Sequence, residues 1–131
     1  MDQSFPKKEK LKSATLISTL FTEGNSVSKY PLRLVFMEIE ETEKIKTAVS
    51  VSKRSFKKAV DRNRIKRLMR EAYRLNKHLF LNTVKENSLA FMFLYTGKEM
   101  PTLEKLNSSM LRIHQKFEDF YALGNSIKHQ K

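Results

Sequence analysis

The stretch from Lys53 to Arg74 constrains this chain more than any other part of it. It carries ten basic and two acidic side chains, so a net charge of +8 falls in about a sixth of the 131 residues, against +12 for the whole chain. At 100° per residue, a helix here has one apolar side and one basic side. The apolar side holds Ile65, Leu68, Met69, Ala72 and Leu75. We therefore predict a long helix over residues 56–77 that packs on a core by one face.

The basic side of this helix has same-sign charges at helical spacing. The row consists of Arg62, Lys66, Arg70 and Arg74, with Asn63 and Arg67 beside it. Like charges four residues apart repel by about 0.2–0.5 kcal/mol a pair, whereas stacked guanidinium groups match phosphate oxygens. The alternatives are a merely solvated face and a helix lying on an anionic membrane. The spacing favours nucleic acid, and the apolar side is needed to cover a sheet.

Composition narrows the class of protein further. The length and the 40% hydrophobic share fit one domain with a modest core. The absence of cysteine excludes disulfides, cysteine-ligated zinc and thiol catalysis. The longest apolar run, residues 89–95, is far shorter than the about 20 residues of a membrane span. We expect a cytoplasmic protein without a signal peptide, and a chain this cationic usually has a polyanionic partner.

The other hydrophobic patterns predict two more helices and three strands. These are helices over residues 14–22 and from Thr102 onward, and strands over residues 27–39, 45–52 and 88–95. Gly24 suits the end of the first helix, and Pro31 favours a strand start, a bulge or an edge. The last strand is apolar throughout, which is typical of a central strand covered on both faces. The order indicates an α+β fold with one mixed sheet of about four strands and helices packed on it.

Candidate catalytic groups form no pattern in this sequence. The three histidines, at 78, 114 and 129, lie too far apart to resemble a metal-ligand motif. The acidic residues between Glu38 and Glu43 lack the glycine and spacing of a calcium loop, so we expect a solvated hairpin turn there. No Ser/His/Asp order or glycine-rich phosphate loop stands out. The chain is therefore expected to bind rather than to catalyse.

One continuous stretch resembles a known family. Residues Ser50 to Arg74 read SVSKRSFKKAVDRNRIKRLMREAYR, which is similar to the signature of the bacterial ribonuclease P protein subunit. Arg62, Asn63 and Arg64 match the family's Arg-Asn-Arg motif, after a strand that ends in Ser-x-Ser-Lys. The resemblance covers about residues 10–122. Many members have Gly-Asn where this chain has residues 56–58, so no role for a glycine is carried over at that place.

The resemblance implies an auxiliary subunit of an endonuclease whose catalyst is RNA. That RNA removes the 5′ leader of precursor tRNA, using Mg²⁺ that it binds mainly itself. The implied partners are the ribonuclease P RNA and precursor tRNA, with no membrane and no obligate protein partner. The implied fold is one domain over residues 1–131, with an ordered core over about 10–122 and flexible tails. The family's β-α-β crossover is left-handed, although sequence reasoning alone would choose a right-handed one.

The resemblance also implies two sets of binding residues. The catalytic RNA would contact Lys57, Lys58, Arg62, Asn63, Arg64, Lys66, Arg67, Arg70 and Arg74. The single-stranded leader would lie between the sheet and the first helix, where aromatic rings can stack on bases and cations can hold phosphates. The leader set is Phe21, Arg33, Phe36, Ser50, Ser52, Lys53 and Arg54. The aromatic candidates for stacking are Phe21, Tyr30 and Phe36, and each of them could be a core residue instead.

The alternative function is a non-catalytic RNA-binding protein, such as a ribosomal component or an RNA chaperone. It would explain the charge and the size equally well. It would not explain a Ser-x-Ser-Lys strand end followed by the Arg-Asn-Arg motif.

Overall fold

The computed structural model describes residues 14–40 and 45–129, which form three helices and four strands. The elements are α1 (Ala14–Glu23), β1 (Asn25–Lys29), β2 (Leu32–Glu38), β3 (Ile45–Val51), α2 (Ala59–Val84), β4 (Leu89–Tyr95) and α3 (Leu103–His129). The strands form one sheet in the order β1-β2-β4-β3. Neighbours are antiparallel except β3 and β4, which are parallel. The predicted α+β class with a single mixed sheet is confirmed.

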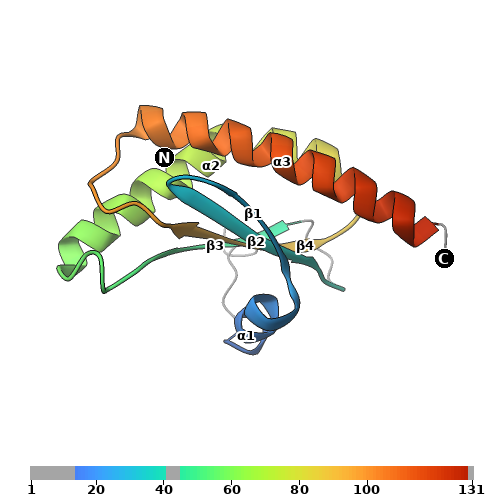
Figure 1. The fold of residues 1–131 in the computed structure, drawn as a ribbon, viewed down its shortest axis with the longest axis horizontal. Helices are drawn as coiled ribbons and strands as arrows, with labels where there is room; N and C mark the ends of the chain where they lie inside the picture. The colour runs from blue at the N-terminus through green and yellow to red at the C-terminus, as the bar shows by residue number, and fades with distance from the viewer. Residues whose placement is uncertain (1–13, 41–44, 130–131) are drawn as a thin grey trace, which may run out of the picture.

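The sheet lies between two unequal layers of helices (Figure 1). Helices α2 and α3 pack side by side over one face, and the short α1 lies on the other. Helix α2 connects the adjacent parallel strands β3 and β4, as predicted for the basic crossover helix; the hand of this crossover stays a prediction. No helix in the two described ranges is long and apolar enough to cross a bilayer.

The larger core lies under α2 and α3 and fixes the basic helix on the sheet. Strand β4 is central and buried along its length except for half-buried Leu94, as its sequence predicted. Fully buried Phe91 contacts the rings of Phe80 and Phe117, with centroid distances of 5.4 and 5.2 Å. Helix α3 begins as predicted, because the Lys105 N–H donates to Thr102 Oγ1 at 3.2 Å. Aromatic burial of this extent makes the sheet a rigid support for the surface charges.

The predicted strand over residues 27–39 is in fact a hairpin. Strands β1 and β2 pair with Lys29 opposite Leu32, and Tyr30 and Pro31 form the turn, with a cis peptide bond between them. Proline has no N–H to give to a sheet ladder, so it sits at the turn. The acidic stretch after β2 is not a hairpin turn, because β4 lies between β2 and β3. Its residues 41–44 lie outside the described residues.

Helix α2 differs from the prediction in its bounds and in its buried face. It begins at Ala59 rather than at residue 56 and continues to Val84. Its buried face includes Tyr73, Asn76 and Phe80, whereas Leu75 is 43% exposed and Leu68 is only half-buried. The hydrophobic face is therefore turned toward Tyr73. This rotation moves the predicted row of cations to the flank of the helix.

Candidate nucleic-acid interface

The loop between β3 and α2 holds four exposed cations on a fixed backbone. The Phe56 N–H donates to the Ser52 carbonyl oxygen at 3.1 Å, and the Arg54 N–H donates to Ser52 Oγ at 3.1 Å. The Phe56 ring lies against Tyr95, with centroids 5.9 Å apart. The exposed cations are Lys53, Arg54, Lys57 and Lys58. Because the backbone is anchored, these side chains can contact a polyanion without first ordering the loop.

The first turn of α2 is stabilised from within by Arg62. Its Nη1 donates to the carbonyl oxygens of Phe56 at 2.7 Å and of Lys57 at 2.9 Å. Lys58 occupies the N-cap position without a side-chain cap hydrogen bond. The first N–H groups of the helix thus lie among several cations and one acidic residue, Asp61, and the excess of positive charge favours anions. Arg62 therefore holds the loop in place, and its guanidinium group is less free to bind RNA than the Arg-Asn-Arg motif suggested.

The solvent-facing side of α2 differs from the row predicted on the helical wheel. Arg62, Lys66, Arg70 and Arg74 are all half-buried, whereas Asn63, Arg64 and Arg67 are exposed. Burial lowers the pKa of Arg70 from its ordinary value, although a guanidinium group stays charged at neutral pH. The side chains of Arg64 and Arg67 have no hydrogen bond or ion pair to any described residue. They are therefore the freest cations of the helix.

Arg74 is engaged in a bidentate ion pair. Its Nε and Nη2 donate to the two carboxylate oxygens of Glu71 at 2.8 and 2.7 Å. The hydrogen bond from Arg74 holds the pKa of Glu71 below its ordinary value, and the same bond raises the pKa of Arg74. This arginine is occupied until an anion displaces the carboxylate. It is the one predicted RNA contact with a carboxylate partner among the described residues.

We expect Glu71→Gln to tighten RNA binding. The substitution removes a negative charge from the basic surface and frees the Arg74 guanidinium for a phosphate. A threefold to tenfold gain is expected in a filter-binding titration, consistent with about one phosphate contact. The free energy of unfolding should change little, since ion pairs within one helix at the protein surface contribute little. Unchanged affinity in the Glu71→Gln variant would mean that Arg74 does not face the RNA.

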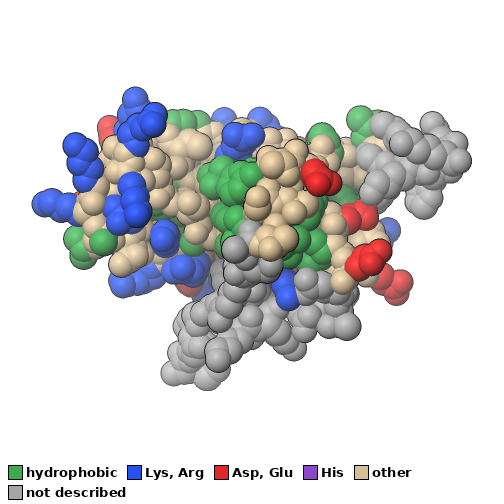
Figure 2. Space-filling view, turned by 90° about the horizontal axis from the view of Figure 1, so that it is seen from below, with side chains coloured by type: hydrophobic (Ala, Val, Ile, Leu, Met, Phe, Trp, Pro, Cys, Tyr) green, Lys and Arg blue, Asp and Glu red, His purple; other side chains and the backbone are tan. Residues whose placement is uncertain are grey.

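Charge is segregated along the length of the molecule. Figure 2 shows the molecule from the α1 side, with Lys and Arg gathered at the end that holds the start of α2. Asp and Glu gather toward the opposite end, and apolar side chains lie between the two. A polyanion is therefore attracted most strongly to the end that holds the start of α2.

Beside α1, part of the sheet is left uncovered by the described residues. Leu20 of α1 packs on Val35 and Met92, and α1 contacts β2 and β4 but not β3. On this same face, Leu94 has Arg33 on one side and Ser50 on the other in the strand register. Arg33 is exposed, and its Nη2 donates to Ser26 Oγ at 3.2 Å. A cation, an apolar side chain and a hydroxyl thus form one row across three strands.

The members of the predicted leader set fall in different places. Phe21, at the end of α1, is 51% exposed, and Ser52 is exposed at the start of the basic loop. Phe36 is 3% exposed on the opposite face, where its ring contacts Phe117 at 4.8 Å. The expectation that Phe36 meets a ligand is wrong, because it shares the strand parity of the core residue Leu34. Tyr30 is exposed at the hairpin turn.

The sequence did not predict the polar contacts between α2 and α3. Asn76 is buried and donates to the Ala72 carbonyl oxygen at 2.8 Å and to Asn107 Oδ1 at 2.6 Å. The Thr83 hydroxyl donates to the Leu79 carbonyl oxygen, so His114 Nε2, 2.9 Å from Thr83 Oγ1, acts as the donor. No group of three potential metal ligands occurs among the described residues. The only sign of the Asn76–Asn107 contact in the sequence is that Asn76 lies at helical spacing from the core residues of α2.

Comparisons with known proteins identify what this chain is similar to. The Ribonuclease P family model matches residues 5–118. The ribonuclease P protein component of Porphyromonas gingivalis is 40% identical over 115 residues, which cover 82% of this chain and 84% of the relative. That of Chlorobaculum tepidum is 31% identical over 120 residues, covering 82% and 78%.

Two solved structures share the fold. The RNase P protein of Staphylococcus aureus has a TM-score of 0.67 at 19% identity, covering 82% of this chain and 93% of that one. The RNase P protein from Thermotoga maritima also has a TM-score of 0.67 at 19% identity, covering 82% and 96%. At this identity the likeness concerns the arrangement of helices and strands.

Proposed function

The chain belongs to the ribonuclease P protein family, and from this premise we propose how its surfaces divide the binding of RNA. It is the protein subunit of an endoribonuclease whose catalysis is carried out by RNA, and its partner is the ribonuclease P RNA. The alternative of a ribosomal component or RNA chaperone is not favoured. Our proposals concern the residues used, the precursor tRNA, the Mg²⁺ and the cellular compartment.

We propose that the catalytic RNA binds the end of the protein that holds the start of α2. The exposed side chains there are Lys57, Lys58, Asn63, Arg64 and Arg67. Lys66 and Arg70 lie on the flank and can extend the contact, while Arg62 holds the loop in place. The observation that carries the proposal is the segregation of charge, which leaves one strongly cationic end (Figure 2).

We propose that the leader of precursor tRNA lies along the row formed by Arg33, Leu94 and Ser50. The cation suits a phosphate, the hydroxyl suits a sugar or base edge, and small side chains let a backbone approach closely. Ser52, Lys53 and Arg54 continue from this row toward the basic end, and Phe21 offers an aromatic ring from α1. The leader and the catalytic RNA would thus meet at the β3–α2 loop.

We also propose that the Mg²⁺ for cleavage is held mainly by the RNA and that the protein works in the cytoplasm. Both follow from family membership. We also propose a single domain with an ordered core over about residues 10–122, and helix α3 continues past this core to His129.

The test is reconstitution of the full chain with its cognate RNA. At low Mg²⁺ concentration, cleavage of precursor tRNA should require both components. Arg33→Ala should weaken binding of a precursor with a leader about tenfold, as expected for one charged hydrogen bond, and should leave binding of mature tRNA unchanged. The matched control is Arg112→Ala, an exposed arginine of α3. If the protein fails to promote cleavage at every ionic strength, the proposed function is wrong.

A further inference from the structure

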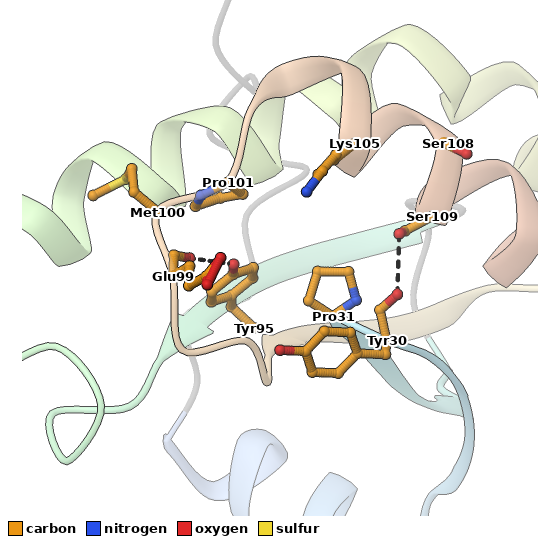
Figure 3. A pocket seen from close by; sticks show the side chains of 9 residues that line it. All are labelled: Tyr30, Pro31, Tyr95, Glu99, Met100, Pro101, Lys105, Ser108 and Ser109. Atoms are coloured by element: carbon orange, nitrogen blue, oxygen red, sulfur yellow. Dashed lines mark hydrogen bonds between the residues drawn. The ribbon is translucent and has the colours of Figure 1, made fainter.

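A pocket of about 290 Å³ lies on the side of the hairpin turn that faces α3 (Figure 3). It is formed where the turn between β1 and β2 meets the end of β4 and the start of α3. The residues that line it include Tyr30, Pro31, Tyr95, Glu99, Lys105 and Ser109. Apart from Tyr30, which the sequence offered as an aromatic candidate for the leader, none of these residues has a role in RNA binding assigned above.

The walls of this pocket are fixed to one another. The Thr96 N–H donates to the Pro31 carbonyl oxygen at 2.7 Å, and Ser109 Oγ donates to the Tyr30 carbonyl oxygen at 3.4 Å. The Tyr95 hydroxyl donates to the Glu99 carbonyl oxygen at 2.5 Å. A Cβ atom at Gly97 would lie 2.5 Å from the Tyr95 hydroxyl, so only glycine fits there. The pocket is therefore preformed, which lowers the entropic cost of filling it.

The side chains that line the pocket combine three kinds of chemistry. The Tyr30 ring is 69% exposed, although aromatic rings usually bury most of their surface. Lys105 reaches in from α3, and Glu99 lies on the Tyr95 side (Figure 3). An aromatic face can stack on a base, an ammonium group can hold a phosphate, and a carboxylate can accept a hydrogen bond from a base amino group.

The pocket also lies near the basic β3–α2 loop. Tyr95, which forms one wall, contacts Phe56 of the basic β3–α2 loop. An RNA strand bound on that loop would need only a short extension to reach the pocket. The position of the pocket near the basic loop therefore favours a role in binding RNA.

We propose that this pocket binds one unpaired nucleotide of RNA, with the base stacked on Tyr30 and the phosphate at Lys105. The inference rests on the proposed function, because it takes the RNA to be already bound at the basic end. The nucleotide can come from the leader or from the catalytic RNA. The chemistry is the same in both cases, and the experiment distinguishes them.

The experiment uses the full chain and a fluorescently labelled single-stranded uridylate hexamer, titrated by anisotropy. Tyr30→Leu should weaken binding about fivefold or more, the lower end of what stacking on one aromatic ring contributes. Tyr30→Phe keeps the ring and should bind like the wild type. Lys105→Gln should lower the slope of log affinity against log salt by about 0.7, as for one single-strand phosphate. Lys85→Gln, an exposed lysine at the other end of α2, is the matched control.

The reconstituted enzyme then identifies the source of the nucleotide. If Tyr30→Leu weakens binding of precursor but not of mature tRNA, the nucleotide belongs to the leader. If it weakens binding of the catalytic RNA alone, the nucleotide belongs to that RNA. Wild-type affinity of Tyr30→Leu in all three assays overturns the inference, as does an equal loss in Tyr30→Phe. The proposed function is judged separately, since cleavage by the wild-type protein does not depend on these variants.

Discussion

The double variant Arg64→Ala/Arg67→Ala is expected to bind the catalytic RNA at least about 100-fold more weakly than the wild type. Each arginine is exposed on α2 and has no partner among the described residues, so both are free for phosphates. A hydrogen bond to a charged group contributes about 1.5–3 kcal/mol, and two of them account for a factor of 100 or more. Thermal unfolding should change little, because no packing or internal hydrogen bond is lost.

The salt dependence of binding gives an independent check on this variant. Two phosphate contacts fewer should reduce the log–log salt slope by about 1.8 if the contacts are to duplex RNA of similar charge density. Arg112→Ala, on the outer side of α3, should change neither the slope nor the affinity. A fall in the unfolding temperature as large as the fall in affinity would show that the buried and exposed faces of α2 have been reversed.

The parts of the fold that sequence predicted well are those with one long, uninterrupted pattern. Strand β4 is apolar at every position and proved to be central. In α3, helical spacing placed Leu106, Met110 and Phe117 in the core, where they are fully buried. The Arg-Asn-Arg motif is equally local, so its position on a helix next to a strand end could be predicted too.

The hairpin and the face of α2 could not be predicted in the same way. Alternation continues from β1 into β2, and only the absent N–H of Pro31 indicated a break between them. On α2, Tyr73 and Asn76 are amphipathic, and their burial depends on the aromatic rings of β4 and on Asn107 of α3. Such contacts join segments that are distant in the sequence, so a helical wheel does not contain them.

The candidate RNA-binding site could likewise be predicted only where its pattern is local in the sequence. The wheel identified the cations, but the partners of Arg62 and Arg74 depend on the path of the loop before α2 and on one carboxylate. The pocket beside Tyr30 is built by the β1–β2 turn and by residues 95–109, which are distant from the turn in the chain, and no local pattern predicts it.

Replacement by alanine should lower the stability of the protein strongly at Phe36 and only slightly at Phe21, although the two residues looked alike in the sequence. Phe36→Ala is expected to lower the free energy of unfolding by about 3–5 kcal/mol, because the ring is 3% exposed and contacts Phe117 and Phe120. Phe21→Ala should change stability by less than about 1 kcal/mol, since half of that side chain is exposed. Urea denaturation followed by circular dichroism measures both.

The leader contact separates the two residues a second time. Phe21→Ala should weaken binding of a precursor with a leader about fivefold or more, if its ring stacks on a base, and should leave mature tRNA unaffected. Phe36→Ala, measured well below its unfolding temperature, should bind precursor and mature tRNA in the wild-type ratio, because its ring lies on the α3 side of the sheet. A selective loss of precursor binding in Phe36→Ala at unchanged stability would place the leader on the opposite face of the sheet from Arg33 and Ser50.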